Sequence, residues 1–468
     1  MGSQTTAVVR EADVLDALKS VKDPDLHRDI VTLGFIKNLR VDGGAIAFDI
    51  ELTTPACPVK ETMQQQAEAA VRALPGVSSV AVQMTAQVRK GQTAPVEGGM
   101  RRVKNAIAIA SGKGGVGKST VATNLALALA RSGAKVGLMD ADVYGPSVPT
   151  MLGGTGAKPE AAEQQGWIRP AERLGIKFMS MGLFAGKDTP VIWRGPMATK
   201  LIQQFLGQVD WGELDYLLID LPPGTGDVQL TLTQSAPLTG AVIVTTPQDV
   251  AVGVTMRGLR MFEQVQVPIL GIIENMSTFV CSHCGKATDI FRHGGGRRAA
   301  ETLGVPFLGE IPLDASIAAA GDAGRPVVVE PEGVKGLRAG ASPAAHAMMD
   351  VAGRLAQEVS IVNEKTMSVR HRPEEIQVND SAIEIRWSDK HTSSYRHRDL
   401  RLACPCAACV DEWTGERRIE PAQVPADVKA LEFHTIGRYA IQIHWSDGHS
   451  TGIYTYDKLR GLDPKAPA

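Results

Sequence analysis

The chain of 468 residues has no excess of charge of either sign, no long apolar run and few cysteines. Lys and Arg number 49 against 51 Asp and Glu, so a net charge of -2 gives the whole chain no electrostatic attraction for nucleic acid. No apolar run approaches the ~20 residues of a membrane-spanning helix, and no signal-peptide core opens the chain. We therefore expect a cytoplasmic protein that binds neither nucleic acid nor membranes.

The six cysteines are too few for a disulfide framework in a chain of this length. Five of them nevertheless fall into two tight clusters. Cys281 and Cys284 are spaced C-x-x-C, and Cys404, Cys406 and Cys409 follow later in the chain. Clustered thiols that form no disulfides favour metal binding, so the sequence predicts two metal sites.

Residues 111–120 read SGKGGVGKST and contain the phosphate-binding pattern G-x-x-x-x-G-K-[ST]. The glycines let backbone amides turn toward a phosphate, while Lys118 reaches the terminal phosphates and Ser119 binds magnesium. An apolar run precedes the loop and an Ala- and Leu-rich segment follows it, which is the strand, loop and helix order that this motif requires. The predicted nucleotide-binding residues are Gly112, Gly114, Gly115, Val116, Gly117, Lys118, Ser119 and Thr120.

Carboxylates close two later apolar runs of the same region. Asp140 and Asp142 end one run, and Asp220 ends another. Because the carboxyl ends of parallel strands meet at one edge of a sheet, we expect all three carboxylates on the edge that carries the phosphate-binding loop, where such groups hold Mg²⁺ and its waters. Further predicted strands lie at 241–247, 269–273 and 305–309. The pattern predicts an α/β fold, a doubly wound and mostly parallel sheet of the P-loop NTPase type.

Composition divides the chain into three units. A polar segment rich in Gly and Pro predicts a linker at 91–102, and a second break is predicted at 363–376. Apolar residues at helical and at alternating spacing predict a small α+β domain over 1–90. The nucleotide domain then spans 103–362, and a small β-rich domain spans 377–468.

The last hundred residues contain an internal repeat. The pattern I-x-I-x-W-S-D-x-H occurs at 383–391 and again at 441–449. Alternating apolar residues followed by a turn predict two similar hairpins. Between the copies lie Cys404, Cys406 and Cys409, and a histidine would complete a tetrahedral zinc site.

This C-terminal unit resembles the small N-terminal domain of gamma-butyrobetaine hydroxylase and its relatives. The resemblance implies a bound zinc ion and maps the fourth ligand onto His449, with His391 and His434 as alternatives. An iron-sulfur role for the cysteine triplet is the alternative to zinc. The chain has no counterpart of the oxygenase's catalytic domain, so we expect no hydroxylase activity.

The remaining cysteine, Cys57, lies in the loop TTPACP at 53–58, at a predicted strand-to-helix junction. A thiol there can be a metal ligand or a nucleophile, and a small buried apolar residue is the alternative. This loop, together with KDPDL at 22–26 and VTLGF at 31–35, resembles the small domain of iron-sulfur assembly factors. That resemblance favours a part for Cys57 in cluster transfer.

The phosphate-binding loop resembles the deviant Walker loop of the MinD/ParA class, because Lys113 lies inside it. Residues 140–147 and 220–227 resemble the two switch segments of that class. Together with WRGPM at 193–197 and ENMS at 274–277, they are most similar to the Mrp/ApbC iron-sulfur cluster carriers.

The resemblance implies roles for individual residues. Lys113 would reach across a face-to-face dimer to the partner's nucleotide, and Asp142 would position the attacking water. Asp140 and Asp220 would serve magnesium through its waters, and Asn275 would contact adenine. Because phosphoryl transfer needs positioning and neutralised charge, a lysine supplied in trans would make hydrolysis depend on dimerisation. The predicted catalytic residues are Lys113, Lys118 and Asp142.

Cys281 and Cys284 supply two thiolates, whereas a mononuclear site or a four-iron cluster usually has four ligands. A symmetric homodimer supplies four, and the resemblance to Mrp carriers implies a bridging [4Fe-4S] cluster. Structural zinc and a redox dithiol are the alternatives.

Together these features predict an ATPase that uses ATP and Mg²⁺, forms a homodimer, and carries a labile cluster from donors to iron-sulfur apoproteins. One alternative is a MinD/ParA-like partitioning or positioning switch without a cluster. Another is an electron-transfer ATPase, like the nitrogenase reductase, that keeps its cluster.

Overall fold

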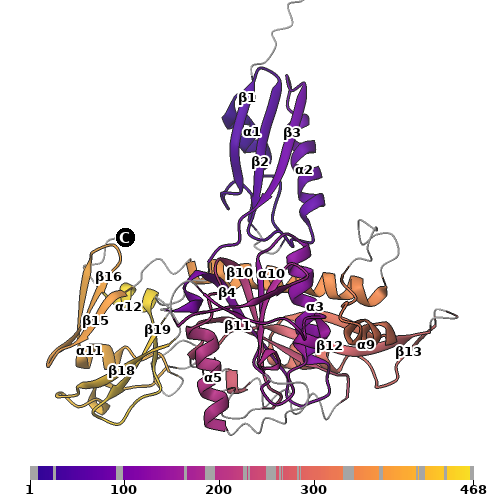
Figure 1. The fold of residues 1–468 in the computed structure, drawn as a ribbon. Coiled ribbons are helices and arrows are strands. Elements are labelled where there is room, and N and C mark those ends of the chain that lie inside the picture. The colour runs from indigo at the N-terminus through magenta and orange to yellow at the C-terminus, as the bar shows by residue number, and fades with distance from the viewer. Residues whose placement is uncertain are drawn as a thin grey trace, which may run out of the picture. The chain divides into compact units, whose positions relative to one another are not determined.

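The computed structural model (Figure 1) divides into two compact units, Met1–Asn363 and Glu364–Ala468. None of its described helices is long and apolar enough to cross a membrane. The residues that the structure describes are 9–24, 28–90, 98–162, 166–184, 195–224, 229, 232–233, 235–248, 260–262, 265, 267–281, 284, 286–329, 342–367, 373–406, 409–410, 417–436 and 440–463.

The first unit begins with a small α+β domain (Figure 1). Its central strand β2 pairs antiparallel with β1 and parallel with β3. Ile46, Phe48 and Ile50 of β2 are buried and alternate with more exposed residues, because successive side chains of a strand face opposite sides. The alternation seen in the sequence therefore predicted this strand correctly. The elements are α1 (Glu11–Leu18), β1 (Ile36–Asp42), β2 (Ala45–Leu52), α2 (Lys60–Arg72) and β3 (Ser79–Ala86).

A nine-stranded sheet forms the centre of the rest of this unit. Its order is β13-β12-β11-β4-β10-β5-β9-β8, and β14 also pairs with β12. The β12–β13 and β8–β9 pairs are antiparallel and the other pairs are parallel, which confirms the predicted mostly parallel sheet. The strands are β4 (Val103–Ala110), β5 (Val136–Asp140), β8 (Ala171–Arg173), β9 (Ile176–Ser180), β10 (Leu214–Asp220), β11 (Leu238–Thr245), β12 (Ile269–Val280), β13 (Ala287–Thr288) and β14 (Phe307–Leu313); a separate pair is β6 (Glu160–Ala161) with β7 (Ile168–Arg169).

Helices cover both faces of this sheet. Ile107 and Ile109 of β4 pack with α3 and α10, whereas Ala106 and Ala108 pack on the other face with α5 and α8. Because both faces are covered, β4 is buried along nearly its whole length, as the continuous apolar run in the sequence predicts. The helices are α3 (Lys118–Arg131), α4 (Val148–Met151), α5 (Gly195–Gly207), α8 (Gly295–Leu303), α9 (Ala315–Asp322) and α10 (Pro343–Met367), with short 3-10 turns at η1 (Gly99–Arg102) and η2 (Met181–Leu183).

Described elements occupy part of both predicted linkers. Residues 91–97 of the first lie outside the described residues, but Gly99 and Met100 of η1 are buried. A Cβ on Gly99 would overlap the carbonyl oxygen of Val209, so this end of the predicted linker is packed against the nucleotide domain. At the second break α10 continues to Met367 and β15 begins at Pro373. Composition marks the breaks, whereas packing sets where the neighbouring elements end.

The second unit consists of two similar halves, each a three-stranded antiparallel sheet followed by a helix. The two copies of the sequence repeat form the central strands β16 and β19 with their turns, which confirms the predicted pair of hairpins. The first half contains β15 (Pro373–Val378), β16 (Ala382–Trp387), β17 (Thr392–Arg396) and α11 (His397–Leu402); the second contains η3 (Pro421–Gln423), β18 (Ala430–Ile436), β19 (Ala440–Trp445), β20 (Ile453–Thr455) and α12 (Tyr456–Leu462).

The two halves make reciprocal hydrogen bonds through their tyrosines. The Tyr395 hydroxyl of the first half donates to the Leu459 carbonyl oxygen at 2.6 Å. The Tyr454 hydroxyl of the second half donates to the Leu400 carbonyl oxygen at 3.1 Å. Repeated residues thus occupy equivalent places, and the halves are related by an approximate twofold.

Two buried arginines form reciprocal ion pairs between the halves in the same way. Arg401 of the first half pairs with Asp447 in the second turn at 2.8 Å, and Arg460 of the second half pairs with Asp389 in the first turn at 2.6 Å. Each half therefore supplies the ion-pair partner that the other half's turn needs.

Candidate functional site

The phosphate-binding loop joins the end of β4 to the start of α3, in the order predicted from the sequence. Gly115 and Gly117 have φ angles of 77° and 78°, in the left-handed region that glycine tolerates best. A Cβ on Gly117 would lie 2.4 Å from Nδ2 of Asn275, which donates at 2.8 Å to the Val116 carbonyl oxygen. The buried Asn275 side chain thus holds the loop where Gly117 leaves room for it.

We predict that Gly117→Ala lowers the stability of the nucleotide-free protein by about 2 kcal/mol or more, because a left-handed alanine costs roughly 1–2 kcal/mol before any clash with Asn275. Gly114→Ala is the matched control, since a Cβ there meets nothing within 4 Å. Chemical denaturation measures both variants. Equal losses would contradict the importance of the Gly117–Asn275 contact.

Three neighbouring strands end in register beside this loop. Asp220 of β10 pairs with Asp140 of β5, and Asp140 pairs with Ser180 of β9. All three side chains are buried. Lys118 reaches from the loop to Asp220, with Nζ 2.5 Å from Oδ1, and its Nζ also lies 3.3 Å from Oγ of Ser119. The structure therefore brings together the lysine, hydroxyl and carboxylates that the sequence predicted separately.

Asp140 is held by a hydrogen bond that the sequence analysis missed. The Ser180 hydroxyl donates to Oδ2 of Asp140 at 2.9 Å, and the Val148 amide donates to the same oxygen at 3.3 Å. No motif marks Ser180, but its place at the end of a neighbouring parallel strand could have identified it.

The two aspartates carry more buried negative charge than Lys118 alone neutralises. Burial and the neighbouring Asp220 raise the pKa of Asp140 to about 7. Burial also raises the pKa of Asp220, against the opposing effect of Lys118. Among the described residues, Oδ2 of Asp220 is buried without a hydrogen-bond partner. A hard divalent cation would neutralise the remaining negative charge, and its waters would hydrogen-bond to the unpaired carboxylate oxygen, so the residues suit Mg²⁺.

The other predicted nucleotide-site residues lie at the same sheet edge. The Asp142 amide donates to Oδ1 of Asp140 at 3.2 Å, and Oδ1 of Asp142 accepts from the Gly145 amide at 3.3 Å. Lys113 is partly exposed on the loop, and its carbonyl oxygen accepts from the Ser111 hydroxyl at 3.0 Å. The catalytic roles of Lys113 and Asp142 stay predictions, as does adenine binding by Asn275.

A second buried carboxylate, Glu274, was not singled out in the sequence analysis. Its two oxygens accept the amides of Gly294 at 3.0 Å and Gly296 at 2.5 Å, at the start of α8. A carboxylate at a helix N-terminus stabilises the unpaired amides there. Glu274 therefore fixes α8 on the strand that also carries Asn275.

Cys281 and Cys284 lie at the far end of that same strand, in the connection between β12 and β13. The Cys281 amide donates to the Lys286 carbonyl oxygen at 3.0 Å and closes the hairpin. Cys281 is partly exposed and Cys284 is exposed. Nearby Val280 and Ile290 are also exposed, by 40% and 51%. Exposed thiols and apolar side chains on one hairpin are typical of a surface that binds another protein.

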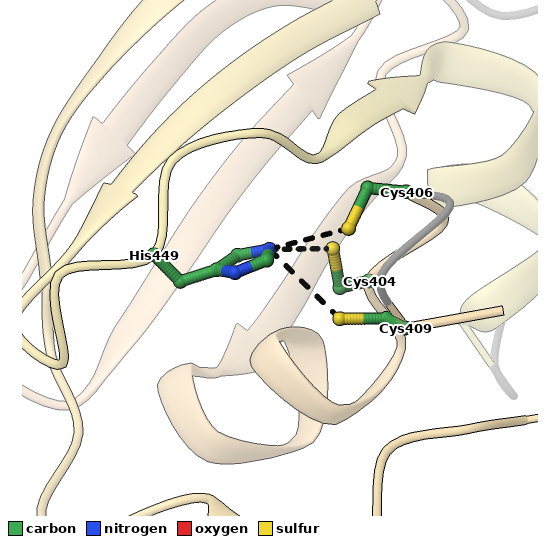
Figure 2. Close-up of side chains that lie close together, drawn as sticks. All are labelled: Cys404, Cys406, Cys409 and His449. Atoms are coloured by element: carbon green, nitrogen blue, oxygen red, sulfur yellow. Dashed lines mark hydrogen bonds between the residues drawn. The ribbon is translucent and has the colours of Figure 1, made fainter.

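Cys404, Cys406, Cys409 and His449 converge in the C-terminal unit (Figure 2). Nε2 of His449 lies 3.1, 3.5 and 3.9 Å from the sulfurs of Cys404, Cys406 and Cys409. Tetrahedral zinc with ordinary Zn–S and Zn–N bonds sets sulfur and nitrogen about 3.6 Å apart. A Cβ on Gly452 would lie 2.5 Å from the Cys404 sulfur, so the backbone leaves room for this thiol. The set fits a zinc ion.

The surroundings adjust these ligands in different directions. Burial, followed by the charge of Arg401, lowers the pKa of His449 and favours the neutral imidazole that binds metals. Burial raises the pKa of Cys404 to about 12. Although burial opposes the shift, hydrogen bonds with Thr451 and the other two thiols lower the pKa of Cys406 to about 7.

The two alternative histidines lie elsewhere. His391, the counterpart of His449 in the first half, has Nε2 2.7 Å from Oδ2 of Asp463. Asp463 follows Arg460 by three positions, just as Cys404 follows Arg401. The first half's equivalent of the cysteine–histidine contact is therefore a histidine–aspartate contact. His434 faces Glu432 instead.

Cys57 is partly buried against the core of the N-terminal domain. It lines a cavity of about 20 Å³ with Thr54, Pro58 and residues of α10. In the same loop, Oγ1 of Thr54 lies 3.2 Å from the hydroxyl of Tyr216 in β10. The predicted role of Cys57 in transfer stays a prediction.

Relatives of known name align with most of the chain. A protein of Synechocystis sp. named iron-sulfur cluster carrier protein is 49% identical over 352 residues, covering 74% of this chain and 97% of that protein. A rice protein named Fe-S cluster assembly factor HCF101, chloroplastic, is 41% identical over 467 residues, covering 98% of this chain and 85% of that protein. A solved structure of a nucleotide-binding protein from Archaeoglobus fulgidus with ADP is 42% identical, covers 48% of this chain and 89% of that chain, and has a TM-score of 0.43.

Three protein families match successive parts of the chain. Residues 11–84 match the iron-sulfur cluster assembly protein family, and residues 374–460 match the gamma-butyrobetaine hydroxylase-like N-terminal family. Both resemblances seen in the sequence are thereby confirmed. Residues 102–353, more than half of the chain, match the family described as NUBPL iron-transfer P-loop NTPase. By this match and by its close relatives, the chain belongs to the iron-transfer P-loop NTPases.

Proposed function

We propose that this protein is an ATP-dependent carrier that binds a labile [4Fe-4S] cluster and delivers it to apoproteins. The cluster is cargo, held by the Cys281 and Cys284 pairs of two copies. The names of the relatives favour this function over a partitioning switch. The observation that carries the proposal is the exposed dithiol at the end of β12.

The same strand connects the dithiol to the nucleotide loop. Asn275 contacts the loop through the Val116 carbonyl oxygen, and Cys281 follows six positions later, just past the end of β12. β12 pairs with β11 as far as Glu274 and with β14 as far as Phe279, but Met276 has a φ of 57° and the pairing with β14 is irregular between Asn275 and Phe279. A change in the loop on nucleotide binding would therefore reach the hairpin through this irregular part of β12.

Dimerisation would complete both sites. Val280, Ile290 and Phe291 expose apolar surface beside the cysteines, which favours burial against a second copy. Two copies supply the four thiolates that a [4Fe-4S] cluster takes. Lys113 of each copy would then neutralise charge on the partner's nucleotide.

In the nucleotide site, Lys118 would leave Asp220 for the terminal phosphates of ATP, and Ser119 would bind Mg²⁺. Bound Mg²⁺ supplies charge neutralisation at the phosphates. Asp140 and Asp220 would hold its waters, and Asp142 would orient the attacking water. Lys118 can leave Asp220 and bind the phosphates only when another cation takes its place beside that carboxylate.

The C-terminal tetrad would hold structural zinc, since its four ligands leave no open position for chemistry. Cys57 would act as a transfer residue near α10. The cytoplasmic location predicted from the sequence stays a prediction.

We predict that Cys281→Ser and Cys284→Ser each prevent cluster binding, because either change leaves the dimer two thiolates instead of four. After anaerobic reconstitution, the unmodified protein should show broad visible absorption with about two irons and two sulfides per chain. Cys57→Ser is the control and should retain the cluster. A colourless unmodified protein, or full absorption in the Cys281→Ser variant, would disprove the proposed site.

A cluster-transfer assay distinguishes a carrier from an electron-transfer ATPase. The reconstituted protein is incubated with an apo-ferredoxin, and the clusters are followed by circular dichroism with and without ATP. Movement of the cluster to the ferredoxin supports the carrier. Retention through repeated oxidation and reduction supports electron transfer.

A further inference from the structure

The C-terminal unit carries a second group of metal-ligating side chains, separate from the cysteine tetrad. Oε1 of Glu432 lies 3.6 Å from Nε2 of His434 and 3.4 Å from Nδ1 of His444. One ligand atom from each of the three residues lies within 4.8 Å of the others. The two imidazole rings are edge-on to each other, with centroids 5.2 Å apart.

Strand register explains why these side chains meet. Glu432 and His434 are two apart on β18, so they share one face, and Glu432 is directly opposite His444 on β19. The intervening Phe433 and the neighbouring Ile443 pack toward the core. The three polar side chains therefore lie together on the solvent face, exposed by 40–60%.

The first half of the unit shows what an ordinary surface contact looks like at this place. Glu375 is opposite Arg386, as Glu432 is opposite His444, and Gln377 holds the position of His434. The Arg386 guanidinium pairs with Glu375 at 2.8 Å, and the Gln377 amide donates to the same carboxylate at 2.8 Å.

In the second half, both partners of the carboxylate are imidazoles. An ion pair needs one cation, and two protonated imidazoles beside each other would repel. Two neutral imidazoles and one carboxylate, however, are the donor set of open zinc and non-haem iron sites. Where the first half has Gln377 and Arg386, the second half has two histidines. These lack the donors that suit a salt bridge and supply nitrogen lone pairs that suit a metal.

We propose that Glu432, His434 and His444 bind a first-row divalent transition-metal ion. Metal–ligand bonds of about 2.1 Å set neighbouring ligand atoms roughly 3.0–3.4 Å apart, close to the 3.4 and 3.6 Å found here. Three protein ligands on an exposed face leave the remaining positions to water. Binding is therefore exchangeable, unlike binding by the closed cysteine tetrad.

The test uses the full chain with zinc in the tetrad and with Cys281→Ser and Cys284→Ser, so that those thiols take up no metal. Calorimetric titration with Ni²⁺ is compared between this protein and the same protein with His434→Gln and His444→Arg. These two changes reproduce the Glu375, Gln377 and Arg386 arrangement, so the hairpin should stay folded. We expect the loss of one bound Ni²⁺, or at least a tenfold weaker affinity.

His293→Gln is the control, because His293 lies in a group with Glu274 and Glu310 in which both Glu274 oxygens already accept the Gly294 and Gly296 amides. It should leave the Ni²⁺ titration unchanged. Paramagnetic broadening by Ni²⁺ should also reach the ring resonances of His434 and His444 in the protein that retains them. Unchanged binding in the His434→Gln and His444→Arg protein, loss in His293→Gln, or broadening that spares both rings would each overturn the proposal.

Discussion

Replacing Lys118 with alanine is expected to lower ATP hydrolysis by about 10²–10³-fold or more, since removal of one preorganised charge at a transition state typically has effects of this size. Lys118 is 6% exposed and its ammonium already faces the position of the strand-end carboxylates. Hydrolysis is measured as phosphate release at saturating ATP and Mg²⁺.

The same change also carries a stability effect, because Lys118 is the partner of a fully buried Asp220. Breaking a buried pair by removing one member costs about 3–5 kcal/mol, since the other charge stays unpaired. Asp220→Asn added to Lys118→Ala removes that charge. The double variant should regain most of the unfolding free energy while hydrolysis stays lost.

This pair of variants distinguishes catalysis from folding. If Lys118→Ala loses activity only because it unfolds, this variant would hydrolyse ATP at the normal rate at a temperature where it is folded. If Lys118→Ala is as stable as the unmodified protein, the ion pair of the nucleotide-free state has no energetic role.

Much of the nucleotide site could be predicted because it depends on local pattern and strand register. The glycine loop is contiguous, and parallel strands bring Asp140 and Asp220 to one edge however the rest folds. Ser180 and Glu274 escaped prediction because each acts through a contact with a residue distant in sequence. Ser180 could have been found only by predicting its strand, and the ENMS segment at 274–277 contains Glu274 without showing its contacts with Gly294 and Gly296.

A comparison of the two copies of the C-terminal repeat could have predicted more about the cysteine site than the motif alone did. The three candidate histidines could have been ranked by comparing the copies, since Asp463 occupies the first half's equivalent of Cys404. That difference marks His391 as the partner of an aspartate and leaves His449 to the cysteines. The ends of α10 and β15 could not be found this way, because packing determines them.

The second large effect is expected at the cysteine tetrad. Cys404→Ser should remove the zinc equivalent and unfold the C-terminal unit, while the nucleotide domain keeps its own transition. Structural zinc contributes apparent binding free energies of about 10–16 kcal/mol in small domains, whereas a whole domain is stable by about 5–15 kcal/mol. A unit built around this tetrad therefore has little stability left without its metal.

The approximate twofold supplies the matched control. His391→Ala breaks the equivalent contact of the first half, where Asp463 is 8% exposed and His391 19%. The His391→Ala variant should lose a few kcal/mol of unfolding free energy at most, because this contact involves no bound metal. Its zinc content should stay at one per chain. Metal analysis and near-ultraviolet circular dichroism of Trp387 and Trp445, both buried in this unit, measure the two outcomes. Equal loss of structure in both variants would mean that the unit depends on the interface between its halves, whereas loss in Cys404→Ser alone would place its stability in the metal.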